Sequence, residues 1–253
     1  MSEQTFEFVK TNGVTLRVAT SGDGPLVVLV HGFPESWYSW RHQIKALSEA
    51  GYRVAAPDVR GYGESERPEA VEAYDLESLT GDIAGLAEAL SPGEKAVVVG
   101  HDWGAPIAWN TARLHADKFR AVAGLSVPYM PMGDVMFLDM VHKVFTERGL
   151  FFYQVYFQDI GPPEAELEAD PAETIRKFYY AISGDAPDGT WPTDKKHGDT
   201  LLHRLPEPPM PRLCVPEKPS GQSGDPTAVT VHWWHEGSGA ENVPGGHRRR
   251  DEA

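Results

Sequence analysis

The stretch Val97-Val98-Val99-Gly100-His101-Asp102-Trp103-Gly104 constrains this chain more than any other. A run of β-branched residues ends at a glycine, a reactive side chain follows two positions later, and a second glycine opens an apolar segment of small residues. This layout is typical of a nucleophile elbow, a sharp turn from a strand into a helix whose glycines let neighbouring backbone pass close to a strained residue. The pattern predicts a strand, a strained Asp102 and a helix in immediate succession.

Asp102 stands where a lipase or esterase would have serine. A carboxylate nucleophile attacks carbon and becomes an ester, which water must then cleave. The alternative interpretation is a buried strand ending in an aspartate that caps the next helix, which is a common use of this residue. On the motif alone, the two interpretations stand equal.

The segments around the elbow alternate between apolar runs and amphipathic stretches. Asn12-Gly13 is a strong hairpin signal, which predicts an antiparallel pair at the start of the sheet. We expect strands over 5–11, 14–20, 25–30, 52–57, 95–99 and 119–127, and helices over 37–47, 76–90 and 105–114. Such alternation is typical of an α/β fold, with a mostly parallel sheet covered by helices on both faces. Ligands bind such sheets beyond the carboxyl ends of the strands, where we expect Asp102 and the loop 31–34 to meet.

From residue 130 the sequence becomes rich in Met, Phe and Tyr, with Gly-Pro breaks between its segments. We expect residues 1–129 to form the core and 130–205 to form a helical lid inserted over the crevice. The last part, 206–253, has 14 Pro or Gly among its 48 residues, a composition typical of irregular structure.

Composition excludes several classes of function. The formal net charge of −14 argues against nucleic acid or anionic membrane as a partner, because both attract basic surfaces. Cys214 is the single cysteine, which leaves no internal disulfide and no cysteine-based metal cluster. The sequence lacks both an apolar run long enough for a membrane span and a basic, then apolar leader. We therefore expect a cytoplasmic protein.

Four segments, in this order, resemble the α/β-hydrolase-fold epoxide hydrolases: His31-Gly32-Phe33-Pro34-Glu35-Ser36-Trp37, Asp58-Val59-Arg60-Gly61-Tyr62-Gly63-Glu64-Ser65, Gly100-His101-Asp102-Trp103-Gly104 and Tyr153-Gln154-Val155-Tyr156-Phe157-Gln158. The resemblance covers about residues 5–205. It implies that Asp102 is the nucleophile that opens the epoxide, and that the backbone N–H groups of Phe33 and Trp103 form an oxyanion hole. Tyr153 would donate a hydrogen bond from the lid to the epoxide oxygen.

The implied substrates are a small apolar epoxide and water, with a vicinal diol as product and no metal or organic cofactor. The haloalkane and haloacid dehalogenases use the same Asp nucleophile and are the alternative, but the Tyr-containing lid segment favours epoxides. Without the resemblance, Tyr153 would be interpreted as a core residue among its aromatic neighbours. His31 and His101 are interpreted as structural hydrogen-bond partners beside the site.

The resemblance also implies two more strands after the lid, carrying an acidic residue and a histidine base, and a second lid tyrosine. None of these can be placed in the sequence. His247, in Val243-Pro244-Gly245-Gly246-His247, is a weak candidate for the base, and His232 and His235 are weaker. The sequence thus predicts a truncated or altered C-terminus, with the last strands missing and the reaction stalling at the ester. A non-catalytic fragment, or an interaction protein that forms a homo-oligomer through an exposed sheet edge, is the other alternative.

Overall fold

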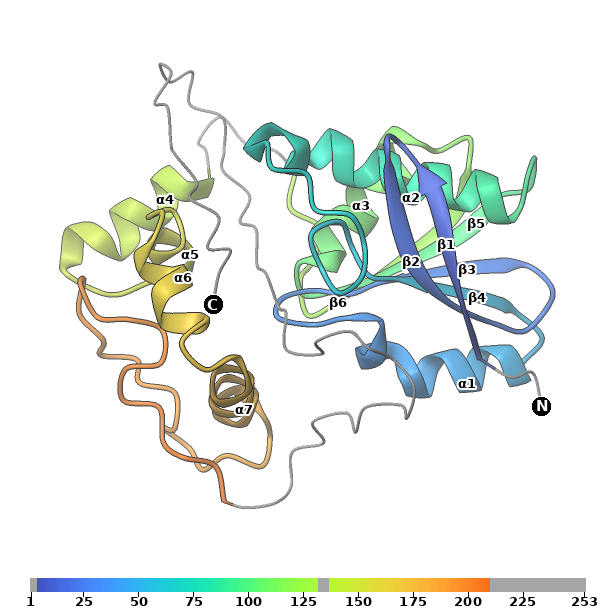
Figure 1. The fold of residues 1–253 in the computed structure, drawn as a ribbon. Coiled ribbons are helices and arrows are strands. Elements are labelled where there is room, and N and C mark those ends of the chain that lie inside the picture. The colour runs from blue at the N-terminus through green and yellow to red at the C-terminus, as the bar shows by residue number, and fades with distance from the viewer. Residues whose placement is uncertain (1–3, 132–136, 210–253) are drawn as a thin grey trace, which may run out of the picture.

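A computed structural model describes residues 4–131 and 137–209. Its centre is a six-stranded sheet with the strand order β1-β2-β4-β3-β5-β6 (Figure 1). The strands are β1 (Thr5–Thr11), β2 (Val14–Ser21), β3 (Leu26–Val30), β4 (Arg53–Pro57), β5 (Ala96–His101) and β6 (Phe119–Leu125). β2 pairs antiparallel with β1 and β4, and the remaining pairs are parallel. The mostly parallel α/β sheet predicted from the sequence is confirmed.

The turn between β1 and β2 shows why the hairpin signal is reliable. Asn12 and Gly13 both have positive φ, of 42° and 80°, the conformation of a type I′ turn. Such turns match the twist of the flanking strands, so Thr11 pairs directly with Val14. Chemistry confined to two adjacent residues therefore sets the register of the whole hairpin.

Helices cover both faces of the sheet. α1 (Arg41–Glu49), which follows the 3₁₀ helix η1 (Trp37–Trp40), lies on one face, while α2 (Leu76–Leu90) and α3 (Gly104–Leu114) lie on the other (Figure 1). A second 3₁₀ helix, η2 (Val71–Tyr74), precedes α2. In β3, Val28 belongs to the apolar cluster under α2 and α3, and Val27 and Leu29 belong to the cluster under α1. Because the strand is covered twice, it has no polar face, as its uninterrupted apolar run predicted.

A helical region lies beside the sheet (Figure 1). It consists of α4 (Phe137–Val144), the 3₁₀ helix η3 (Thr146–Arg148), α5 (Tyr153–Tyr156), α6 (Pro162–Leu167) and α7 (Pro171–Ile182), followed by an irregular segment as far as residue 209. Within the aromatic segment 150–158, only the four residues of α5 are helical. The backbone just before α5 pairs with a distant segment instead: the Phe151 N–H donates to the Lys195 carbonyl, and Leu150 forms a β-bridge with Lys196.

This helical region contacts the core at the loop that follows β3. The Phe33 ring packs edge-on against Phe157 and Phe178, with ring centroids 5.7 and 5.6 Å apart. The Tyr179 hydroxyl in α7 donates a hydrogen bond to the Pro34 carbonyl, at 3.0 Å. The contact therefore involves the same loop that the sequence places at the mouth of the crevice.

Among the described residues, no helix is both long and apolar enough to cross a membrane. Residues 210–253 lie outside the described part of the chain. The candidates His232, His235 and His247 are among them.

Candidate functional site

The turn between β5 and α3 places Asp102 in a conformation that few residues adopt. Its φ is +50°, in the left-handed region that aspartate tolerates better than most side chains. The two flanking glycines are required by close backbone approaches. A Cβ atom at Gly100 would overlap the Gly104 carbonyl, and one at Gly104 would overlap the carbonyls of Val30 and His31. The turn thus has the tight geometry that the glycine spacing predicted.

The Asp102 carboxylate lies against the loop that follows β3. Its Oδ1 atom accepts a hydrogen bond from the Phe33 backbone N–H at 2.9 Å. The backbone of Gly32 passes so close that a Cβ atom there would overlap Oδ1. Val30 pairs with Gly100 in the sheet, so both strands end at the same level, and this register brings the two loops together. The expected meeting of Asp102 with the loop 31–34 at the strand ends is confirmed.

His31 fixes the shape of this loop. Its Nδ1 lies 2.9 Å from the Gly32 carbonyl, and its Nε2 accepts a hydrogen bond from the Val59 N–H at 3.0 Å. Burial lowers the pKa of His31, which favours the neutral ring that can donate from one nitrogen and accept at the other. These contacts fit the structural role expected for this residue.

Glu35 connects the loop after β3 to the elbow. Glu35 accepts a hydrogen bond from the Gly32 N–H at 2.8 Å, and its carboxylate also lies 3.0 Å from Nδ1 of His101. His101 immediately precedes Asp102 in the chain. Glu35 therefore links the two loops that form the mouth of the crevice.

Asp102 opens onto a cavity of about 460 Å³ between the sheet and the helical region. Phe33 and Asp102 supply the core side of the wall. The helical side is mostly apolar and aromatic, and its lining residues are Phe145, Phe151, Phe152, Tyr153, Phe178, Ile182, Trp191, Pro192 and Thr193. The volume falls in the range of small-molecule sites. Sequence reasoning did not single out Phe178, Ile182 and Trp191, which carry no motif and reach the cavity only through the packing of the helical region.

Tyr153, at the start of α5, lies in the wall of the same cavity as Asp102. Burial, together with the negative charge of Asp102, raises the pKa of Tyr153 to about 12, so the phenol keeps its proton at neutral pH. Gln154 donates a hydrogen bond to the phenol oxygen at 2.9 Å. The Tyr153 ring also packs against Phe152 and Phe157, so the residue is part of the aromatic packing as well as of the cavity wall.

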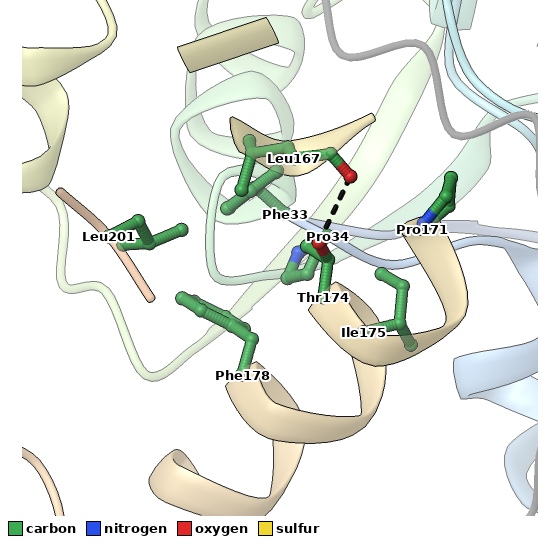
Figure 2. Close-up of a pocket in the computed structure, with 8 residues that line it drawn as sticks. All are labelled: Phe33, Pro34, Leu167, Pro171, Thr174, Ile175, Phe178 and Leu201. Atoms are coloured by element: carbon green, nitrogen blue, oxygen red, sulfur yellow. Dashed lines mark hydrogen bonds between the residues drawn. The ribbon is translucent and has the colours of Figure 1, made fainter. Parts of the chain in front are cut away.

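A smaller cleft of about 20 Å³ lies where α7 meets the loop after β3 (Figure 2). Phe33 and Pro34 face Thr174, Ile175 and Phe178 there, and the Thr174 hydroxyl donates to the Leu167 carbonyl at 3.0 Å. This volume holds about one water molecule. The cleft is a packing seam between the core and the helical region, and the larger cavity is the candidate site.

In the described part of the chain, no group of three or more His, Cys, Asp or Glu residues is placed to hold a metal ion.

Comparison with known proteins places this geometry in a family. Residues 25–176 match the alpha/beta hydrolase fold family. Epoxide hydrolase A of Mycobacterium tuberculosis is 49% identical over 214 residues, which are 82% of this chain and 65% of that protein. The crystal structure of epoxide hydrolase A from Mycobacterium thermoresistibile has a TM-score of 0.75 and 47% identity, and covers 82% of this chain and 65% of its own.

An epoxide hydrolase from an endophytic Streptomyces has a TM-score of 0.77 and 43% identity, over 83% of this chain and 63% of its own. The chain thus spans less than two thirds of the length of these relatives. The match reaches from β3 into α7 and includes the elbow, the loop after β3 and the aromatic segment at α5. The chain belongs to the alpha/beta hydrolase fold family, in which its similarity is to the epoxide hydrolases.

Proposed function

We propose that this chain reacts with small apolar epoxides, in the manner of an epoxide hydrolase, through an ester on Asp102. The observation that carries the proposal is the Asp102 carboxylate, which opens onto an aromatic cavity and has a protonated tyrosine in the wall of the same cavity. A carboxylate oxygen of Asp102 attacks an epoxide carbon, and the bond between that carbon and the epoxide oxygen breaks. The electron pair goes to the oxygen, which takes a proton from Tyr153.

The hydrogen bond from Phe33 indicates which carboxylate oxygen attacks. Oδ1 accepts the Phe33 N–H, so Oδ2 is the better candidate for the new bond to carbon. Oδ1 then becomes the carbonyl oxygen of the ester, and it gains negative charge when water attacks that carbonyl. The Phe33 N–H is already directed at the atom where this charge develops, and the Trp103 N–H is proposed as the second donor of the oxyanion hole.

The second step, hydrolysis of the ester to a diol, needs a group that activates water. His31 is unsuited to this role, because both of its ring nitrogens are engaged with backbone groups. The sequence candidate His247 lies outside the described residues. We therefore propose that this chain forms the ester and hydrolyses it slowly. We also propose that residues 130–205 act as the lid over the cavity.

The mass of the intact protein tests the proposal directly. After incubation with styrene oxide, an aryl epoxide, we expect a single added epoxide mass on a peptide containing Asp102, with little diol in the supernatant. Asp102→Asn keeps the size of the side chain and an acceptor for the Phe33 N–H, and it should abolish the adduct. An unmodified wild-type chain that forms no diol would refute the proposal, as would an adduct that persists in the variant.

Steady diol production would retain Asp102 as nucleophile but reject slow hydrolysis, and His247→Gln would then be the next variant to assay. The cytoplasmic location expected from the sequence belongs to the same proposal, and cell fractionation tests it.

A further inference from the structure

The phenol oxygen of Tyr153 is a hydrogen-bond acceptor in this structure. Gln154 Nε2 donates to it at 2.9 Å. An amide N–H can only donate, so this contact does not use the proton of the phenol. The Tyr153 hydroxyl can therefore donate that proton to a second group, and Tyr153 lies in the wall of the cavity onto which Asp102 opens.

We infer that Gln154 is a positioning residue, which holds the Tyr153 hydroxyl so that its proton is free for the epoxide oxygen. The inference rests on the proposed function, because it concerns the proton that ring opening consumes. The other polar atom of the Gln154 amide does not restrain the side chain, because Oε1 is buried without a hydrogen-bond partner among the described residues. The contact with Tyr153 is thus the one side-chain hydrogen bond of this amide in that part of the chain.

The same donor acts again after the proton has moved. Ring opening forms the bond from Asp102 to carbon, breaks the bond from carbon to oxygen and transfers the Tyr153 proton to that oxygen. The products are a hydroxyalkyl ester and a tyrosinate. The Gln154 N–H then donates to a charged oxygen, and hydrogen bonds to charged groups are stronger than those to neutral ones. Gln154 therefore favours the transition state over the bound substrate, which predicts an effect on rate rather than on binding.

Single-turnover kinetics test this inference. The protein is kept in excess over styrene oxide, and loss of the epoxide is followed by chromatography at increasing protein concentration. This measures ring opening whether or not the ester is later hydrolysed. Gln154→Met keeps the length of the side chain and removes the donor. We expect its maximum rate to fall about tenfold, the size of a hydrogen bond to a charged group, with little change in the half-saturating concentration.

Two further variants separate positioning from simple packing. In a Tyr153→Phe background, Gln154→Met should cause no further loss, because the group that it orients is gone. Gln158→Met is the matched control, since Gln158 also donates a side-chain hydrogen bond in this segment, to the Gln154 carbonyl at 3.1 Å. It should stay within about twofold of the wild type, as expected away from the reacting groups.

The outcomes distinguish this inference from the function on which it rests. If Tyr153→Phe slows ring opening but Gln154→Met does not, only the inference fails. It also fails if the Gln154 effect is equally large in the Tyr153→Phe background, or if Gln158→Met loses as much activity. If the wild type consumes no epoxide, the proposed function and the inference both fail.

Discussion

At the scale of single residues, Asp58 is a buried carboxyl group whose pKa is raised. It follows β4 and is completely buried. Its Oδ1 accepts the Trp37 N–H at 3.0 Å, and Arg17 lies 3.5 Å from Oδ2. Burial raises the pKa of Asp58 to about 6, although the Trp37 N–H and the Arg17 charge partly offset the rise. The carboxyl therefore holds its proton more tightly in the folded chain than in the unfolded one.

This shift predicts a pH-dependent stability. The pKa rises on folding from 3.8 to about 6, so the stability gained from this proton is complete below pH 4 and is lost as the pH rises through 6. Asp58→Asn removes the titration. Relative to the wild type, its free energy of unfolding should therefore improve by up to about 3 kcal/mol between pH 4 and pH 7. Urea unfolding at several pH values measures the difference, and parallel curves for the two proteins would contradict it.

At the scale of elements, the elbow depends on the absence of a side chain at Gly104. A Cβ atom there would overlap the backbone at the end of β3. Gly104→Ala must push α3 away from β3, and we expect it to lower the free energy of unfolding by about 3 kcal/mol. Gly184→Ala is the matched control, because a Cβ atom at Gly184 would meet no atom of the described residues within 4 Å.

Denaturant unfolding compares the two alanine variants. Gly184→Ala should change stability by less than about 1 kcal/mol, the size of the backbone entropy effect. Equal destabilisation by the two substitutions would show that close backbone packing does not explain the elbow glycine.

At the scale of the whole molecule, Tyr179 joins the helical region to the core. Its hydroxyl donates to the Pro34 carbonyl, next to the residue whose N–H contacts Asp102. Tyr179→Phe should cost about 1 kcal/mol of stability, as for a typical hydrogen bond. We also expect faster amide hydrogen exchange in α7, because the contact restrains its local opening.

Tyr180→Phe, at the next position of the same helix, is the control. It should change stability by less than about 0.5 kcal/mol, because it removes one hydroxyl from a half-buried side chain and keeps the ring. Hydrogen exchange that is equally fast in both variants would argue against a specific role for the Tyr179 contact.

The sequence by itself determined the order and type of most core elements and the position of the elbow. These features depend on neighbouring residues: the double coverage of β3 appears as an uninterrupted apolar run, and the turns at Asn12 and Asp102 follow from glycine and aspartate chemistry. The aromatic segment before α5 differs, because its backbone pairs with residues 195–196, more than 40 positions away, and no local pattern indicates this pairing.

Only the tertiary structure decided how the cavity is built. Lys195 is an example, because hydropathy predicts it to be exposed, whereas it is buried and donates to the Thr200 carbonyl at 3.1 Å. Trp191 reaches the cavity wall, and the Phe33 N–H reaches Asp102, only after distant segments have packed together. Glycine spacing and hydrophobic periodicity indicate only the local structure of residues that are close together in the sequence. The direction of a proton or the wall of a cavity depends on contacts between segments, which no local pattern encodes.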